Sequence, residues 1–150
     1  MSVRSTAWLV RIAVAALTVF PVAACASDGS SSTAADEETV AVTLDDGVVT
    51  LTPDAVSAGA VALTATNEGT QVHEFEVLGV PEGVDANALP VQDNVADVAS
   101  QGLEVVDEIE DIAPGTTAEL TLDLEPGTYV VICNRAGHYA MGRHATLTVG

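Results

Sequence analysis

The C-terminal stretch GTYVVICNRAGHYAMGRHATLTVG, residues 127–150, combines strand signals with most of the cysteine, histidine and methionine residues of this chain. Side chains of a strand alternate between its two faces, so TYVVIC directs Cys133, at the strand end, to the same side as its core residues. A loop with His138 and Met141 follows, and a second strand, ATLTV, closes the stretch. A thiolate at a strand end and an imidazole on the next loop can close on one metal ion.

The chain from residue 39 onward shows two-residue alternation interrupted by turns. The segments that read as strands are VAVTL, VVTLT, AVALTATN, HEFEVLGV, LEVVDEIEDI, TAELTLDL, TYVVIC and ATLTV. Turn residues separate several of them, for example DDG at 45–47 and PG at 114–115. Seven or eight short strands with such spacing predict an all-β fold, an antiparallel β-sandwich. Residues 81–101 interrupt the pattern, and we interpret them as an excursion in which DNVADVAS offers at most one short helix.

The N-terminus has the parts of an export signal. Arg4 and Arg11 form a positive region, IAVAALTVF supplies an apolar run too short to span a bilayer comfortably, and small residues follow. The tetrapeptide VAAC, residues 22–25, resembles a bacterial lipobox, in which a signal peptidase cuts before a lipidated cysteine. An ordinary secretory signal that is cut near Ala26 is the alternative.

These signals divide the chain into three parts. We predict a lipoprotein signal peptide at residues 1–24, a lipidated and flexible polar tether at 25–39, and the working domain at 40–150. Several acyl chains on Cys25 would anchor the protein stably, because a single chain binds membranes only marginally. The chain is therefore expected to be exported and anchored to the outer face of the cytoplasmic membrane.

The chain is strongly acidic. Beyond Cys25 it keeps two basic residues, Arg135 and Arg143, against all 22 acidic residues, which makes the formal charge of that part −20. Such a surface repels phosphate backbones and itself. The charge therefore argues against nucleic acid as a partner and favours a monomer or a basic protein partner.

Cys133 is expected to be a free thiol, and a free thiol in an exported domain calls for an explanation. If Cys25 is lipidated, Cys133 is the single thiol of a domain in an oxidising compartment. Metal ligation is one reason, and burial in the core is the other, because free cysteine is among the most buried residue types. His73 begins a predicted strand, and strand ends at one edge of a sandwich would bring it beside Cys133 and His138. One thiolate and two imidazoles form the trigonal donor set of blue copper sites, which a weak axial ligand normally completes.

Two segments carry a resemblance to a known family. TNEGTQVHEF and EPGTYVVICNRAGHYAMG resemble the two metal-bearing motifs of the cupredoxins, in particular of small bacterial plastocyanin-like or azurin-like copper proteins. The resemblance extends over about residues 40–150. It implies a Greek-key β-sandwich with one type 1 copper ion, held by His73, Cys133 and His138. The alternative is a core cysteine with two unrelated histidines.

The fourth copper ligand is where this sequence departs from the family. Relatives with GHYxxGM place the axial methionine five residues after the loop histidine, and Arg143 stands at that position here. Its guanidinium has no lone pair to give. Met141 stands three residues after His138, a spacing found in one branch of the family. Either Met141 is the axial ligand, or it packs under the loop and a water, a backbone oxygen or nothing takes that place.

Three residues are candidates for positions next to the ligands, where they would influence the properties of the bound metal. Ligand imidazoles need their other N–H fixed, and nearby hydrogen bonds tune a copper thiolate. Asn67 and Asn134 could supply such bonds, or could instead stabilise turns. Arg143, if it lies close to the metal, should favour Cu(I) over Cu(II) and give the acidic surface one positive spot. His144 is expected to be a surface or loop-packing residue.

Electron transfer is the function that these features favour. Catalysis is not expected, because the chain has no second metal motif, no Gly-x-Ser-x-Gly elbow and no zincin helix. Two alternatives remain, namely delivery or sequestration of copper at the membrane and a metal-free cupredoxin-fold module that binds partners. For an anchored carrier, the expected partner is a redox protein or a membrane oxidase.

Overall fold

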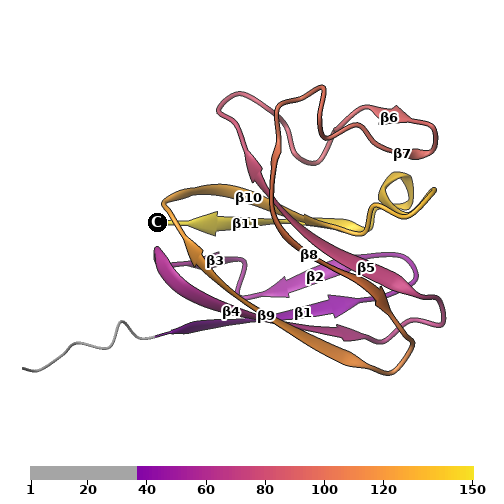
Figure 1. Cartoon of the computed structure of the whole chain (residues 1–150), viewed down its shortest axis with the longest axis horizontal. Helices are drawn as coiled ribbons and strands as arrows, with labels where there is room; N and C mark the ends of the chain where they lie inside the picture. The colour runs from indigo at the N-terminus through magenta and orange to yellow at the C-terminus, as the bar shows by residue number, and fades with distance from the viewer. Residues whose placement is uncertain (1–36) are drawn as a thin grey trace, which may run out of the picture. The chain divides into compact units, whose positions relative to one another are not determined.

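The computed structural model describes residues 37–150, in which two sheets form the two layers of a β-sandwich (Figure 1). The first sheet contains, in spatial order, β2 (Val49–Thr52), β1 (Glu38–Leu44), β4 (Gly59–Asn67) and β9 (Thr117–Leu124). The second contains β3 (Ala55–Val56), β11 (His144–Val149), β10 (Gly127–Ile132), β5 (His73–Val80) and β8 (Glu104–Ile112). The remaining elements are a hairpin of β6 (Val91–Gln92) and β7 (Val95–Ala96), and a short 3₁₀ helix, η1 (Tyr139–Met141).

The two layers are mixed sheets, whereas the sequence predicted antiparallel pairing. β1 runs parallel to β4, with Val42 opposite Ala65, and β11 runs parallel to β3. The path of the chain explains this, because β3 joins the edge of the second sheet before β4 returns beside β1. Connections that cross between layers are typical of Greek-key sandwiches. The predicted all-β sandwich is therefore confirmed, and its eight longer strands match the expected number within residues 37–150.

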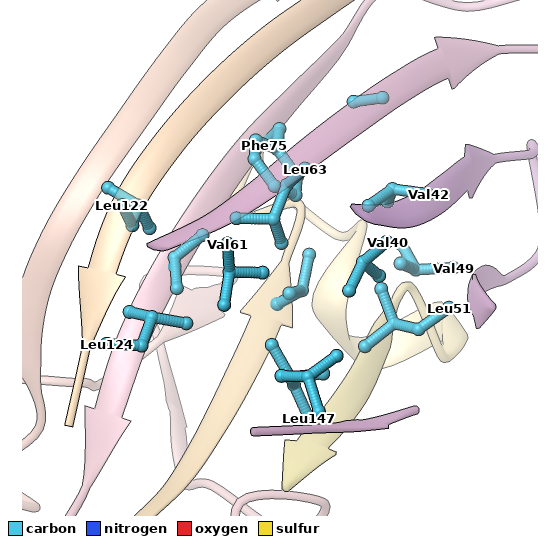
Figure 2. Packing of buried hydrophobic residues seen from close by; sticks show 14 of the residues in the cluster. Val40, Val42, Val49, Leu51, Val61, Leu63, Phe75, Leu122, Leu124 and Leu147 are labelled. Carbon is cyan, nitrogen blue, oxygen red and sulfur yellow. The ribbon is translucent and has the colours of Figure 1, made fainter. Parts of the chain in front are cut away.

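The main hydrophobic core fills the space between the two sheets. In β1, Val40, Val42 and Leu44 are buried, while the residues between them are partly or fully exposed. Figure 2 shows such side chains directed into the interior from both layers, among them Phe75 of β5 and Leu63 of β4. Burying one aliphatic or aromatic side chain of this size contributes about 1.5–3 kcal/mol. The core thereby holds the strand ends, which carry the candidate ligands, in place.

The excursion between β5 and β8 covers the outer face of the second sheet. Its apolar residues form a second core with residues of β5, β10 and η1; the buried members are Leu78, Ala86, Leu89, Ala96, Leu103, Val130, Ile132 and Tyr139. In Figure 1 the β6–β7 hairpin lies beside η1, with which β7 makes contact. As a result, the second half of β10, residues 130–132, is buried on both faces.

This excursion contains a hairpin where the sequence offered one short helix. β6 and β7 pair across Asp93 and Asn94, whose φ angles are 49° and 71°. Positive φ at both central residues belongs to the two-residue turn that suits a hairpin, and Asn and Asp adopt it more readily than most residues. DNVADVAS is therefore a turn and a strand followed by further turns, and it contains no helix.

The predicted signal peptide, the lipobox with Cys25 and most of the predicted tether lie outside the described residues. β1 begins at Glu38, slightly before the predicted start of the domain at residue 40. Within residues 37–150, no helix is long and apolar enough to cross a membrane.

Candidate metal centre

Three buried side chains meet at one end of the second sheet. His73 is the first residue of β5, Cys133 directly follows β10, and His138 lies in the loop before η1. Because β5 and β10 are antiparallel neighbours, the start of one lies beside the end of the other. The donor atoms of the three residues all lie within 4.8 Å of one another. The structure thus brings together the three ligands that the sequence predicted.

The sulfur of Cys133 contacts both a ring nitrogen and a backbone N–H group. It lies 3.1 Å from Nδ1 of His138 and accepts a hydrogen bond from the backbone N–H of Glu74 at 3.3 Å. The backbone N–H of Cys133 donates to the carbonyl oxygen of Arg143 at 3.0 Å. The thiol is therefore held by contacts with β5 and with the loop that returns to β11.

His73 presents one ring nitrogen to the other two donors. Its Nε2 lies 3.4 Å from a carboxylate oxygen of Asp46, and its Nδ1 is buried without a hydrogen-bond partner. A carboxylate is an acceptor, so this contact places the proton on Nε2 and leaves a lone pair on Nδ1. A buried nitrogen without a partner is unfavourable unless a ligand satisfies it. A metal ion bound between the three donors would do so.

Burial shapes the protonation of all three donors. It lowers the pKa of His73 and lowers the pKa of His138 to about 4, while it raises the pKa of the Cys133 thiol. The positive charge of Arg143 also acts on each group and lowers each pKa. Both imidazoles are therefore neutral near pH 7 with lone pairs available. The thiol keeps its proton until a metal ion displaces it.

Asp46 is the functional residue that the sequence analysis missed. Besides its contact with His73, its carboxylate accepts hydrogen bonds from the backbone N–H groups of Thr70 and Gln71 and from the Thr70 hydroxyl. These bonds, those from Thr70 above all, hold the pKa of Asp46 well below its usual range. The signal in the sequence was the DDG turn, which we took only as a hairpin loop.

Asn67 fixes the loop that leads into His73. Its side-chain N–H groups donate to the carbonyl oxygens of Gln71 and Ile112, both at 2.8 Å, and its carbonyl accepts from the N–H of Gly69 at 2.9 Å. Asn67 is fully buried. These hydrogen bonds stabilise the loop. The hydrogen bond to the Cys133 sulfur comes from the backbone N–H of Glu74 and not from Asn67.

Asn134 ties the ligand loop to the excursion. Its side-chain oxygen accepts from the N–H of Ala96 at 2.7 Å, and its amide group donates to the carbonyl of the same residue at 3.3 Å. Both predicted asparagines therefore act through backbone groups of neighbouring segments. Neither bonds to a donor atom of the three ligands.

Arg143 lies inside the protein, not at its surface. It is 1% exposed, so it supplies no positive spot on the acidic surface, contrary to the hypothesis from the sequence. Its Nε donates to the backbone carbonyl oxygen of Asp46 at 2.8 Å, and its Nη2 donates to the same oxygen. The hairpin turn leaves this carbonyl free of the strand ladder, and the buried side chain can therefore reach it.

Met141 and His144 lie on either side of Arg143 in the chain but differ in surroundings. Met141 ends η1 and is 55% exposed, so it is not packed under the loop, and its role as axial ligand stays a prediction. His144 stacks on Tyr139 with ring centroids 4.6 Å apart. The Tyr139 hydroxyl donates to the carbonyl of Ala86 and accepts from the N–H of Leu89, both at 2.9 Å. Tyr139 thereby anchors the ligand loop to the excursion.

The donor set fits copper by its chemistry. One thiolate sulfur and two neutral imidazoles form the equatorial set of a type 1 copper site, whereas carboxylate and carbonyl oxygens suit magnesium and calcium. The buried Nδ1 of His73 has no hydrogen-bond partner, so its lone pair is free to bind a metal ion. The backbone bond to sulfur and the carboxylate bond to imidazole are the kinds of contact that orient metal ligands.

Comparison with known proteins agrees with this fold. A family model described as the cupredoxin-like domain matches residues 12–149. Similar solved structures include reduced auracyanin from the photosynthetic bacterium Roseiflexus castenholzii, at 21% identity and a TM-score of 0.53, covering 76% of this chain and 98% of that one. Auracyanin B has 22% identity and a TM-score of 0.52 over 75% and 88% of the two chains. Rusticyanin from Thiobacillus ferrooxidans has 18% identity and a TM-score of 0.50 over 75% and 78%.

At these identities the likeness to the solved structures concerns the fold. No curated protein sequence matches this chain. The family match, in contrast, spans most of the chain and includes all three donors. The protein therefore belongs to the cupredoxin-like domain family, as its two sequence motifs predicted.

Proposed function

We propose that this protein is a one-electron carrier with a single type 1 copper ion held by His73, Cys133 and His138. The observation that supports the proposal most is that the three donors lie within 4.8 Å of one another and are buried. Copper held by such a rigid set exchanges an electron with little rearrangement. The protein's part is to orient the donors, through Asp46 and the Glu74 amide, and to exclude water.

The surface near His138 suits electron exchange with a partner. His138 is 8% exposed, whereas His73 and Cys133 are fully buried, so its imidazole offers the shortest route from the solvent. Met141 and Val48 are exposed apolar residues, and the glycines next to them, Gly142 and Gly47, belong to segments that touch. These exposed apolar side chains would give a redox partner an apolar contact beside the ligand loop.

The proposed location rests on the sequence of the N-terminus. The export signal and the lipobox at VAAC support anchoring by a lipidated Cys25 at the outer face of the cytoplasmic membrane. A carrier tethered there would serve a redox protein or a membrane oxidase. The strong negative charge supports a monomer that does not bind nucleic acid.

Titration of the purified full-length apoprotein with Cu(II) tests this proposal. We expect an intense visible thiolate-to-copper band that saturates at one equivalent, is bleached by reductant and returns on oxidation. Cys133→Ser should abolish the band. Cys25→Ser, which removes the other cysteine of the chain, should leave the band unchanged and release the protein from the membrane fraction.

The other outcomes separate the alternatives. Binding of one copper ion without the band and without reversible redox cycling would favour delivery or sequestration of copper. Absence of copper binding would refute the carrier and point to a metal-free module that binds partners.

A further inference from the structure

Arg143 is a buried cation without a carboxylate partner. The ion pairs in the described part of the chain are His73 with Asp46 and Arg135 with Asp111, and Arg143 belongs to neither. Its guanidinium bonds to a backbone oxygen through Nε and Nη2, and its Nη1 is buried without a partner. A buried charge is costly unless it is paired. The burial of Arg143 close to the three donors therefore calls for an explanation.

Asp46 connects this cation to a ligand. Its backbone carbonyl accepts from Arg143, and its carboxylate accepts from Nε2 of His73. The same carboxylate is fixed by the Thr70 and Gln71 backbone N–H groups. The turn between β1 and β2 thus holds one positive and one negative group in fixed positions next to the three donors.

We propose that Asp46 and Arg143 together set the preference of this site for Cu(I) over Cu(II), Arg143 as a fixed charge and Asp46 as a positioning residue with the opposite charge. This inference rests on the proposed function, because it concerns the same copper site. The site carries one more positive charge when it is oxidised than when it is reduced. A fixed cation nearby therefore favours the reduced form, and a fixed anion favours the oxidised form.

The two residues should shift the affinity ratio of Cu(I) to Cu(II) in opposite directions. Arg143→Gln should lower this ratio by at least about tenfold, and a tenfold change corresponds to 59 mV in a one-electron potential. Asp46→Asn should raise the ratio about threefold or more, because it removes the negative charge and keeps the backbone carbonyl. A purely structural role would not produce opposite signs.

The experiment is a pair of competition titrations of the full-length chain, with Cu(I) against a Cu(I)-selective chelator and with Cu(II) against a Cu(II)-selective one. Two matched controls change the net charge equally. Arg135→Gln removes an arginine whose side chain is 39% exposed, and Asp45→Asn removes the exposed carboxylate next to Asp46 in the same turn. We expect both to change the ratio less than about threefold, because solvent screens exposed charges. Arg143→Lys, which keeps the charge, should retain the wild-type ratio.

The outcomes separate this inference from the proposed function. Equal shifts for Arg143→Gln and Arg135→Gln, or shifts of the same sign for Arg143→Gln and Asp46→Asn, would overturn the inference while copper binding stands. If Arg143→Gln does not fold, a fall in the ratio for Asp46→Asn is sufficient to overturn it. A wild-type chain that binds copper in neither oxidation state would overturn the proposed function and the inference with it.

Discussion

Glu76 should destabilise the folded domain above neutral pH. It lies on β5, is 7% exposed, and stands opposite Glu108 of the edge strand β8. Glu74 is two residues away and so lies on the same face of β5. Burial, together with the charges of Glu74 and Glu108, raises the pKa of Glu76 from 4.5 to about 7.

The raised pKa of Glu76 determines how the stability of the domain changes with pH. Since the folded state binds the Glu76 proton more tightly than the unfolded state, the free energy of unfolding falls as the pH rises from 4.5 to about 7 and then levels off. At 1.36 kcal/mol for each pH unit, the full loss is about 3 kcal/mol. Glu76→Gln keeps the shape and removes the titration. We expect it to match the wild type near pH 4.5 and to be more stable by roughly 2–3 kcal/mol at about pH 8.

Denaturant unfolding of the metal-free protein, followed by circular dichroism at a series of pH values, measures this difference. Glu119→Gln makes the same charge change at an exposed position of β9 and should keep the pH dependence of the wild type. The reasoning fails if Glu76→Gln and the wild type lose stability equally between pH 4.5 and about pH 8.

Two further substitutions test contacts around the site. Gly69→Ala should destabilise the fold by about 1–3 kcal/mol, because the added Cβ would overlap a carboxylate oxygen of Asp46 and displace its hydrogen bonds. Thermal unfolding measures this, with Gly47→Ala as the control, since a Cβ there meets nothing within 4 Å; equal effects of the two would contradict the argument. Tyr139→Phe leaves the N–H of Leu89 without its buried acceptor and should cost about 1–3 kcal/mol. Hydrogen exchange at Leu89 should become faster, and unchanged exchange would speak against this role of Tyr139.

The strands and the three donors were predictable because they depend on local properties of the sequence. Alternation in segments such as VAVTL and TYVVIC reflects which face is buried, and the observed strands β1 and β10 lie within a residue or two of these segments. His73 and Cys133 each adjoin one end of a predicted strand. Antiparallel pairing of β5 with β10 is sufficient to bring them together.

Asp46 and the burial of Arg143 were not predictable in the same way. Asp46 is 27 residues from His73 and 97 residues from Arg143, and no periodicity links positions so far apart. Their contact depends on how one turn packs against the ligand loop after the sandwich has formed. An aspartate in a DDG turn carries the same sequence signal whether its carboxylate caps the turn or holds a ligand.

The covering of the second sheet by the excursion has a signal in the sequence, but two-residue alternation alone did not identify it. β10 is apolar on both faces, with Val131 in the main core and Val130 and Ile132 in the second one. A continuous apolar run is what a strand needs when both of its faces are covered. The cover also reaches the ligand loop, through Tyr139 and through the bonds of Asn134. That loop is therefore held from two sides, by the excursion and by the Asp46 turn. Changes in either segment should reach the metal site even though neither provides one of its three donors.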